Sequence, residues 1–360
     1  MKYLLAGGGT AGHIEPALAV GRALLADEPT STLTFLGTPS GLETTLIPAA
    51  GFDLQLITKV KIARKLSPSL LAAPFQLAKA ISQSAKALKG VDCAIGFGGY
   101  VSAPLYVASV LTRTPLVIHE QNARPGWANR IGAYFTRSIA LSYPITNGAL
   151  KKGEVTGLPL RSDVIAAFEN SSHDWRASRE AAKRSLAMRY HLEADAPFVF
   201  IFGGSQGSQA INAVIEEARQ SLETSSNVIH AVGKNNAAPD QSSRYIALNY
   251  IDEMALHYLA ADLVIARSGA VTCAEVAALG KYALFIPLPV GNGEQALNAQ
   301  SLVAANRAEV LAQGGFTSEW LSSNIARLLE LSKSKGDAGD ASGTRSADRI
   351  VAIVKRATGV

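Results

Sequence analysis

The sequence has little of the material that marks several classes of protein. Its 360 residues include only two cysteines, Cys93 and Cys273, too few for a disulfide framework or a metal cluster, and we expect both to be structural. No apolar run reaches the roughly 18 residues of a membrane span, and the apolar stretch before Gly7 is too short for a signal peptide. We therefore expect a globular, cytoplasmic protein. At about 150 residues per domain, its length favours two domains.

Acidic residues are absent from residues 59–89, although the whole chain carries 29 of them. The segment holds seven basic residues, namely Lys59, Lys61, Arg64, Lys65, Lys79, Lys86 and Lys89. Large apolar side chains such as Phe75 and Leu77 lie between them. Two interpretations stay open: a solvated basic face, or a surface that docks on anionic lipid headgroups without spanning the bilayer. Basic and aromatic residues do not interleave, so we expect no nucleic-acid partner.

The chain does contain a regular alternation of strand and helix patterns. Strands are expected near residues 2–6, 32–36, 54–57, 92–96, 115–119 and 138–141, and again near 197–202, 227–231, 245–248, 262–266 and 283–287. This alternation predicts parallel sheets covered by helices. The predicted fold class is α/β, with two Rossmann-like doubly wound domains, residues 1–160 and 161–335, around an interdomain cleft. Residues 331–346 are typical of a flexible connection. The C-terminal helix, within residues 345–360, is expected to pack back on the first domain.

Two of the expected strands run into glycine-rich turns that open helices. Residues 2–6 lead into Gly7–Gly12, and residues 198–202 lead into Gly203–Gly207. The first backbone N–H groups of a helix, together with the positive end of its dipole, suit a phosphate or pyrophosphate at such a turn. A dinucleotide site in the first half would also need an acidic residue after the second strand. Residues 37–39 supply none, so we do not expect one.

Further polar loops follow other expected strands, at the edge where parallel sheets bind ligands. They cover residues 96–102, 119–122, 250–254, 267–275 and 291–298. At residues 250–254 we expect the strand to turn directly into a helix capped by Asp252. Glu275, on the first turns of a helix, can accept hydrogen bonds from both hydroxyls of a ribose. The alternative for Glu275 is an ordinary acid that the helix dipole favours.

Taken together, these loops resemble those of a known family. The segments are GGGTAGH (7–13), GFGGYVSAP (96–104), HEQN (119–122), GLPLR (157–161), FGGSQGSQAIN (202–212), YIDEM (250–254), RSGAVTCAE (267–275) and GNGEQALNA (291–299). In this order, over nearly the whole chain, they are similar to the membrane-associated N-acetylglucosaminyltransferases of peptidoglycan synthesis. HEQN, GGSQG and SGAxTxxE are the most specific of these motifs.

The resemblance implies a two-domain inverting glycosyltransferase of the GT-B architecture, a UDP-GlcNAc-dependent hexosyltransferase of cell-wall biogenesis. It would move N-acetylglucosamine from UDP-GlcNAc to the C4 hydroxyl of undecaprenyl-pyrophosphoryl-MurNAc-pentapeptide, which converts lipid I to lipid II. The enzyme would be peripheral on the inner face of the cell membrane. Its partners would be UDP-GlcNAc, lipid I, an anionic membrane surface contacted through residues 59–89, and other proteins of the cell-wall machinery.

The UDP-GlcNAc contacts implied by the matching motifs lie in both halves of the chain. They are Thr10, Ala11, Gly12, Asn122, Arg161, Ser205, Ile251, Ala270, Val271, Thr272, Cys273, Ala274, Glu275 and Gln295. Two positions depart from the family pattern. Ala11 replaces a glycine, so its amide can serve only if its φ is negative, and Glu294 stands where a second glutamine is often found. Asn298 could hold a sugar hydroxyl like Gln295, or it could be a packing or capping residue.

The body of the chain lacks an Asp-x-Asp pair, which would hold a divalent metal at the leaving group. We therefore expect no cofactor and no metal, with backbone amides at helix N-termini and the Ser205 hydroxyl stabilising the departing UDP. The acceptor hydroxyl must lose a proton as it attacks. His13 is the first candidate for this base, because its loop faces the predicted cleft and imidazole titrates near neutral pH. Glu120 is the second candidate, and His119 is expected to hold its loop in place.

Two other functions stay open at this point. A UDP-sugar epimerase with the same two-domain architecture would hold the nucleotide similarly but would need no lipid-acceptor surface. A scaffold that senses nucleotide sugars at the membrane would keep the Gly203–Gly207 turn and Glu275. Such a scaffold would need neither His13 nor the loop of residues 96–102.

Overall fold

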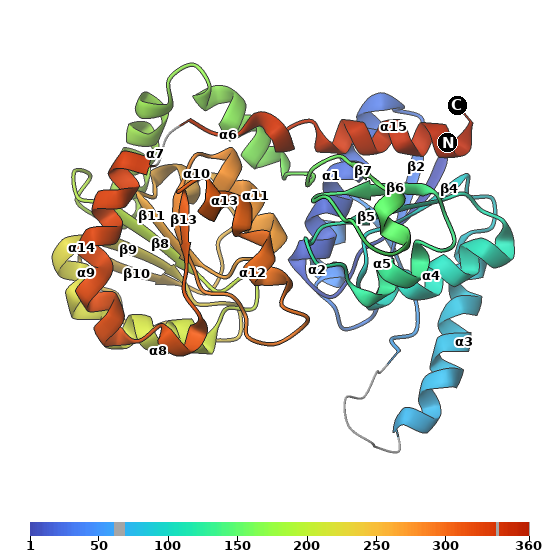
Figure 1. Cartoon of the computed structure of the whole chain (residues 1–360), viewed down its shortest axis with the longest axis horizontal. Coiled ribbons are helices and arrows are strands. Elements are labelled where there is room, and N and C mark those ends of the chain that lie inside the picture. The colour runs from blue at the N-terminus through green and yellow to red at the C-terminus, as the bar shows by residue number, and fades with distance from the viewer. Residues whose placement is uncertain (61–68, 336–337, 360) are drawn as a thin grey trace. The chain divides into compact units, whose positions relative to one another are not determined.

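The computed structural model describes residues 1–60, 69–335 and 338–359. The chain forms two compact units, Met1–Arg161 with Gly343–Val360, and Ser162–Ser342. Each unit is a parallel sheet with helices packed on its faces (Figure 1). This confirms the predicted α/β class with two doubly wound sheets.

The first unit contains, in its described residues, a sheet of seven strands in the order β3-β2-β1-β4-β5-β6-β7. The strands are β1 Lys2–Ala6, β2 Thr32–Gly37, β3 Asp53–Leu56, β4 Cys93–Gly96, β5 Leu116–Glu120, β6 Ser138–Leu141 and β7 Glu154–Val155. All neighbouring strands are parallel. Tyr3 and Leu5 of β1 pack in the core on one face, while Leu4 and Ala6 pack in the core on the other. This two-residue period explains why the strand is apolar from Tyr3 to Ala6.

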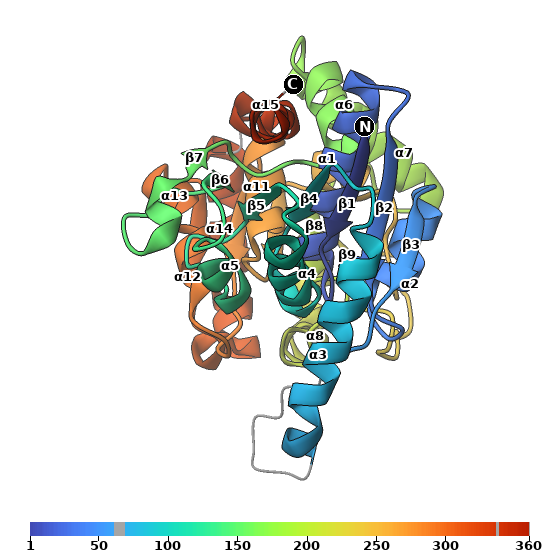
Figure 2. The same ribbon diagram turned by 90° about the vertical axis from the view of Figure 1, so that its right-hand side faces the viewer.

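Helices cover both faces of this first sheet. They are α1 Ala11–Asp27, α2 Glu43–Ala49, α3 Ser69–Ala87, α4 Gly99–Thr112, α5 Trp127–Gly132, the 3-10 helix η1 Ala149–Lys152, and α15 Ser346–Thr358. Helix α4 packs between α3 and α5. In both views the N-terminal part of α3 projects away from the rest of the unit (Figures 1 and 2).

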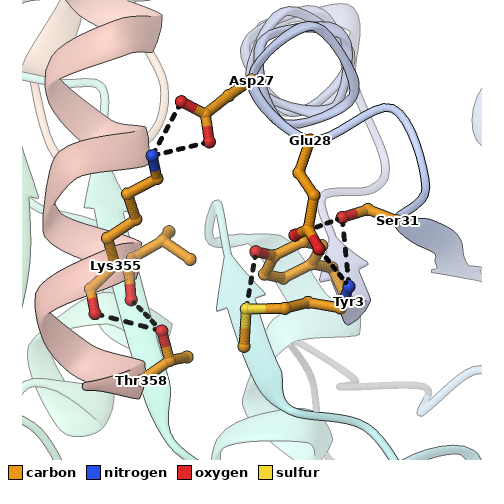
Figure 3. A network of polar contacts seen from close by, with 8 residues as sticks. Tyr3, Asp27, Glu28, Ser31, Lys355 and Thr358 are labelled. Carbon is orange, nitrogen blue, oxygen red and sulfur yellow. Dashed lines mark hydrogen bonds and ion pairs between the residues drawn. The ribbon is translucent and has the colours of Figure 1, made fainter. Parts of the chain in front are cut away.

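The last helix, α15, returns to the first unit after the chain has completed the second. Ile350, Ile353 and Val354 are almost fully buried in the same core as Leu5. The Lys355 ammonium also lies 2.8 Å from the Asp27 carboxylate at the end of α1 (Figure 3). The core on this face of the first sheet is therefore completed by the C-terminal end of the chain.

The second unit contains, in its described residues, a sheet of six parallel strands in the order β10-β9-β8-β11-β12-β13. The strands are β8 Phe198–Phe202, β9 Asn227–Ala231, β10 Tyr245–Leu248, β11 Leu263–Ala266, β12 Tyr282–Phe285 and β13 Ala308–Val310. The helices are α6 Ser162–Ser171, α7 Trp175–Tyr190, α8 Gln209–Glu217, α9 Arg219–Ser225, α10 Met254–Ala260, α11 Ala270–Ala278, α12 Glu294–Asn298, α13 Gln300–Ala304, η2 Gln313–Gly315 and α14 Ser318–Lys335. Val199 and Ile201 of β8 pack in one core, and Phe200 and Phe202 pack edge-on against Tyr258 on the opposite face.

The two sheets share one strand order, in which the first strand of each unit lies beside the fourth. These pairs are β1 with β4 and β8 with β11. From each pair, successive strands are added outward in opposite directions, so the pair marks the point where the strand order reverses. Open α/β sheets bind ligands at such a point, at the carboxyl ends of the strands. The loops that leave these four strands are therefore the candidate binding loops.

Two local expectations were wrong. Residues 331–346 are not a flexible connection throughout, because α14 continues to Lys335, a 3-10 turn η3 covers Ala341–Gly343, and α15 begins at Ser346. Asp252 does not cap α10: the capping position is Glu253, which makes no side-chain capping hydrogen bond. Among the helices of the described residues, none combines the length and apolar character that crossing a bilayer requires. Both cysteines are buried free thiols.

Candidate functional site

In the first unit, the loops that follow β1 and β4 meet around His13. A Cβ atom built on Gly98 would lie 3.4 Å from His13 Cδ2, and one on Gly99 would lie 3.7 Å from His13 Nδ1. Both glycines also have positive φ, 81° and 78°, where other residues are strained. The imidazole therefore lies directly against a turn that this sequence can form only with glycine.

The His13 ring has one nitrogen in a local contact. Nδ1 lies 3.0 Å from Thr10 Oγ1. Burial lowers the pKa of His13 to about 4, and the nearby Glu43 carboxylate partly opposes that change. The ring is thus neutral at neutral pH. When Nδ1–H donates to Thr10, Nε2 keeps its lone pair and can accept a proton.

The departure at Ala11 is compatible with the backbone. Residues 11 and 12 are the first two residues of α1, which begins immediately after Thr10. The described non-glycine residues with positive φ are Arg113, His191 and Asn306, so the φ of Ala11 is negative. An alanine amide at this position can therefore point out of the helix N-terminus as a glycine amide would.

Glu43 is a functional candidate that sequence reasoning missed. Its fully buried carboxylate accepts hydrogen bonds from the Gly9 amide at 3.0 Å, from the Thr38 amide and hydroxyl at 3.0 Å each, and from the Tyr100 hydroxyl at 3.3 Å. These donors belong to the loops after β1 and β2 and to the start of α4. One carboxylate therefore holds together the backbone around His13. No local sequence signal marked it, because its partners come from three separate segments.

Glu120 is fixed by the loop that it precedes. One carboxylate oxygen accepts from the Asn122 amide at 2.9 Å and from Asn122 Nδ2 at 3.3 Å, and the other accepts from the Gly126 amide at 3.1 Å and from Asn129 Nδ2 at 3.0 Å. Burial raises the pKa of Glu120, and these hydrogen bonds oppose the rise. A carboxylate that holds four donors is arranged to position Asn122. Its assignment as a base stays a prediction that this geometry does not favour.

His119 and Arg161 lie elsewhere in the first unit. His119 is completely buried, with Nε2 3.3 Å from both the Gly157 carbonyl and the Ser142 hydroxyl. Burial lowers its pKa to about 4. Arg161 lies with Nε 4.0 Å from the Glu15 carboxylate on α1. His119 therefore joins strand ends of the sheet, while Arg161 lies beside the helix that follows the first glycine loop.

In the second unit, the glycine loop after β8 is shaped by close backbone contacts. Gly204 and Gly207 have positive φ, 93° and 74°. A Cβ on Gly207 would lie only 1.9 Å from the Val232 carbonyl oxygen, so no other residue fits there. Ser205 lies on the turn itself. Helix α8 begins after this loop, and Ser208 caps it by accepting from the Ile211 amide at 3.4 Å.

Arg267 connects this loop to the rest of the carboxyl edge of the second sheet. The guanidinium is nearly buried and donates to the Ser208 hydroxyl at 2.7 Å, to Gln313 Oε1 at 2.6 Å, and to the carbonyls of Ile286 and Pro287 at 2.9 and 3.1 Å. Burial lowers its pKa. All four of these acceptors are uncharged, so they do not neutralise the guanidinium. Its positive charge therefore makes the electrostatic potential around the Gly203–Gly207 loop more positive. Arg267 is the first residue of the RSGAVTCAE motif, and its role depends on contacts that the motif does not indicate.

Residues 270–275 form the first turns of α11, whose capping position is Gly269. Glu275 is 3% exposed and accepts a hydrogen bond from the Tyr258 hydroxyl at 2.9 Å. Contact between Glu275 and a ribose would therefore require the residues that cover it to move. Cys273 is buried, which raises the pKa of its thiol. Ile251 lies between β10 and α10 and is also buried.

Gln295 and Asn298 lie on the short helix α12. Gln295 Oε1 accepts from the Leu288 amide at 3.0 Å, so a hydrogen bond donated to a sugar would come from Nε2. Asn298 is completely buried, and its amide donates to the Ser268 carbonyl at 3.3 Å. Asn298 is therefore a packing residue that ties α12 to the start of α11.

Within each unit the structure brings part of the predicted set together. Thr10, Ala11, Gly12 and His13 lie at one helix start. Ser205 lies on the loop after β8, and residues 270–275 begin the helix after β11, the strand beside β8 at the switch point. Among the described residues, no group of three or more His, Cys, Asp or Glu side chains could hold a metal ion. The arrangement in the second unit offers helix N-terminal amides and a buried guanidinium to an anion.

Comparisons with known proteins give a consistent result. Residues 3–141 match the glycosyltransferase family 28 N-terminal domain, and residues 198–353 match the family 28 C-terminal domain. The UDP-N-acetylglucosamine--N-acetylmuramyl-(pentapeptide) pyrophosphoryl-undecaprenol N-acetylglucosamine transferase of Corynebacterium glutamicum (strain R) is 42% identical over 364 residues, which cover 99% of this chain and 98% of that protein.

Solved structures agree with this result. The crystal structure of Acinetobacter baumannii MurG aligns with a TM-score of 0.69 and 28% identity, over 98% of this chain and 99% of that chain. The UDP-GlcNAc 2-epimerase of Neisseria meningitidis, bound to UDP-GlcNAc, aligns with a TM-score of 0.63 over 99% of this chain and 100% of that chain. At 14% identity, the epimerase is similar in fold alone.

Proposed function

This chain belongs to glycosyltransferase family 28, and we propose that it transfers N-acetylglucosamine from UDP-GlcNAc to the C4 hydroxyl of undecaprenyl-pyrophosphoryl-MurNAc-pentapeptide. The reaction converts lipid I to lipid II in peptidoglycan synthesis. The observation that carries the proposal is the 42% identity with the Corynebacterium glutamicum transferase along 99% of this chain.

We assign the UDP part of the donor to the carboxyl edge of the second sheet. The amides of Gly203–Gly207 and of the first turn of α11, with the Ser205 hydroxyl, would hold the pyrophosphate. The buried Arg267 charge behind the loop would strengthen this contact, because the charge is screened little by water. Glu275 would accept from the ribose hydroxyls, and the backbone around Ile251 would contact the edge of the uracil. Gln295 would donate to the sugar.

The chemistry we propose needs one base and a stabilised leaving group. The C4 oxygen of the acceptor attacks C1 of the donor sugar with inversion, while His13 Nε2 takes the hydroxyl proton. The bond from C1 to the β-phosphate oxygen breaks, and its electron pair leaves with UDP. Preorganised amides and the Arg267 charge would stabilise the growing negative charge without a metal or another cofactor. Further contacts of UDP-GlcNAc with Thr10–Gly12, Asn122 and Arg161 are part of the same proposal.

The acceptor is a lipid, so we also propose that the first unit docks on the anionic inner face of the cell membrane through residues 59–89. In the described part of that segment, Phe75 is 80% exposed and Leu77 is 40% exposed, and Lys79 is exposed on the same helix. Lys86 and Lys89, at and just after the C-terminal end of α3, are exposed as well. Lys61, Arg64 and Lys65 lie outside the described residues. Lys59 contacts the first unit, where its ammonium lies 3.0 Å from Ser40 Oγ.

The test is transfer of radiolabel from UDP-GlcNAc, with and without lipid I, each in the presence and absence of EDTA. We expect labelled lipid II only when lipid I is present, and a rate that EDTA leaves largely intact. Conversion of UDP-GlcNAc to an epimeric UDP-sugar without lipid I would indicate an epimerase instead. Binding of UDP-GlcNAc with no turnover would indicate a sensor. A steep loss with EDTA that magnesium or manganese restores would reject the metal-free mechanism alone.

A further inference from the structure

A buried tyrosine on the neighbouring helix orients the Glu275 carboxylate. The Tyr258 hydroxyl, on α10, donates to Glu275 Oε2, on α11, at 2.9 Å. Tyr258 is 0% exposed and Glu275 is 3% exposed. Because water does not compete for either partner, a hydrogen bond to a carboxylate here is stronger than one at the surface. The tyrosine hydroxyl therefore fixes the orientation of this carboxylate oxygen.

The tyrosine ring itself is held in place by the sheet beneath it. It packs edge-on against Phe200 at 5.6 Å between ring centroids and against Phe202 at 5.9 Å, with interplanar angles of 80° and 79°. Both phenylalanines belong to β8, the strand that ends in the Gly203–Gly207 loop. The position of the Tyr258 hydroxyl is thus set by the same strand that positions the proposed pyrophosphate loop.

The end of α10 is fixed as well. Lys281, buried at the start of β12, donates from Nζ to the Leu259 carbonyl at 2.7 Å and to the Ala261 carbonyl at 2.8 Å. These carbonyls lie at the C-terminal end of α10, where no further helical turn supplies them with donors. Ring packing and this lysine together leave the Tyr258 hydroxyl little freedom to turn away from Glu275.

We propose that Tyr258 is a positioning residue that sets the Glu275 carboxylate for the ribose of the nucleotide, and that the pair makes the site prefer ribonucleotides to 2′-deoxyribonucleotides. With Oε2 oriented by the tyrosine, Oε1 is the acceptor that we assign to the ribose hydroxyls, once the residues that cover Glu275 move aside. A carboxylate free to rotate would accept these bonds less well, because it would first have to be ordered. This inference rests on the proposed donor site in the second unit.

The experiment compares the binding of UDP and 2′-deoxy-UDP by isothermal titration calorimetry, using the full-length chain. Tyr258→Phe removes only the hydroxyl and keeps the ring packed on β8. We expect the wild type to bind UDP more tightly than 2′-deoxy-UDP. In Tyr258→Phe the affinity for UDP should fall roughly tenfold, while the affinity for 2′-deoxy-UDP hardly changes. The ratio of the two dissociation constants should therefore move toward one.

Tyr245→Phe is the matched control, because Tyr245 is equally buried in the same unit and its hydroxyl contacts His230 Nδ1 at 2.7 Å. It should leave the ratio at the wild-type value. Melting curves of both variants separate a loss of folding from a loss of discrimination. A wild-type ratio in folded Tyr258→Phe would overturn the proposal and leave the tyrosine a packing residue. Equal binding of the two nucleotides by the wild type would overturn the ribose contact but not the proposed function, whereas no binding of UDP at all would count against both.

Discussion

At the scale of single residues, the hydrogen-bond donors around a buried carboxylate determine its role. Glu43 and Glu120 are both almost completely buried, and each accepts hydrogen bonds from several loop groups. Four donors from the surrounding loops occupy each carboxylate and fix its position. His13 has the opposite character, because it is neutral and its contact with Thr10 involves only Nδ1. Among the candidates for the base, the geometry therefore favours His13.

The pH dependence of the reaction tests His13. The ring must be neutral to accept a proton, so acid inhibits by protonating it. Burial lowers the pKa of His13 to about 4, below the ordinary 6.5. Hence kcat/KM for lipid I should stay level from pH 7 down to about 5.5, since this quantity reports the base of the free enzyme. His13→Gln should lower kcat by about 10² to 10⁴-fold.

Glu43→Gln sharpens this test. The negative charge of Glu43 raises the pKa of His13, so a neutral glutamine should move the acid limb of the profile to lower pH. Asp53→Asn, which changes an exposed carboxylate on β3 of the same unit, should leave the limb in place. An activity loss in the wild type centred near pH 6.5 would contradict the buried environment of His13. A shift to higher pH in Glu43→Gln would contradict its electrostatic effect.

Some residue roles could be predicted from the sequence and others could not. His13 and Glu275 could be proposed from the sequence because each follows a strand and a small-residue turn, a position that local sequence specifies, and their roles stay predictions. Tyr258 and Glu43 were missed because their importance lies in contacts with distant segments. Tyr258 reaches Glu275 only through the packing of α10 beside α11. Spacing in the sequence carries no information about such packing.

At the scale of elements, the central strands were predictable and the marginal ones were not. The strand β8, FVFIF, is buried on both faces, and its apolar and aromatic run identified it. The edge strands β7 and β13 contain two and three residues and include a glutamate each, so they leave no periodic pattern to detect. The cap of α10 was misplaced because an aspartate is a good capping residue only where the backbone turns. At the start of α10 the capping position is Glu253, one residue after Asp252.

Helix α3 is the element on which the membrane proposal can be tested. Phe75→Ser with Lys79→Gln removes an 80% exposed aromatic ring and one exposed charge from this helix. Each basic group near an anionic surface contributes about 1 kcal/mol, and burial of a large apolar side chain contributes about 1.5–3 kcal/mol. We expect at least tenfold weaker co-sedimentation with anionic vesicles at low salt, and a higher KM for lipid I.

The matched control for α3 is Met188→Ser with Arg176→Gln on α7. Met188 is 79% exposed and the Arg176 side chain is 90% exposed, so the pair removes a similar apolar side chain and charge from the second unit. It should not alter vesicle binding, and neither double variant should alter UDP binding. Equal losses of vesicle binding in the two double variants would show a general effect of charge that is not specific to α3. Vesicle binding by the α3 variant that equals that of the wild type would show that this helix is a solvated surface.

At the scale of the whole molecule, two units repeat one topology. Both sheets place their first strand beside their fourth, and the alternating sequence pattern predicted this class of sheet in each half. The destination of the C-terminal helix depends on more than pattern. Its apolar residues predict that α15 packs on a domain, and the first domain was the expected one. The structure places α15 in the core of the first unit.

The C-terminal helix also gives a prediction about how stability is distributed along the chain. Ile350, on α15, is completely buried in the core formed by α1 and β1. Ile350→Ala should therefore destabilise the first unit by about 2–5 kcal/mol, although residue 350 follows the second unit in sequence. The exposed ion pair of Lys355 with Asp27 should contribute much less. Hydrogen exchange measured peptide by peptide should show faster exchange in β1 and β4, with β8 and β11 unchanged.

The reciprocal variant completes this test. Ile211→Ala removes a completely buried side chain from the core of the second unit, so it should accelerate exchange in β8 and β11 and leave β1 and β4 as they were. Each unit has its own core, and the two substitutions remove the same side chain from each. If Ile350→Ala instead accelerated exchange in the second unit to the same degree, the two cores would unfold as one cooperative structure. The C-terminal helix would then stabilise the whole chain and not the first unit alone.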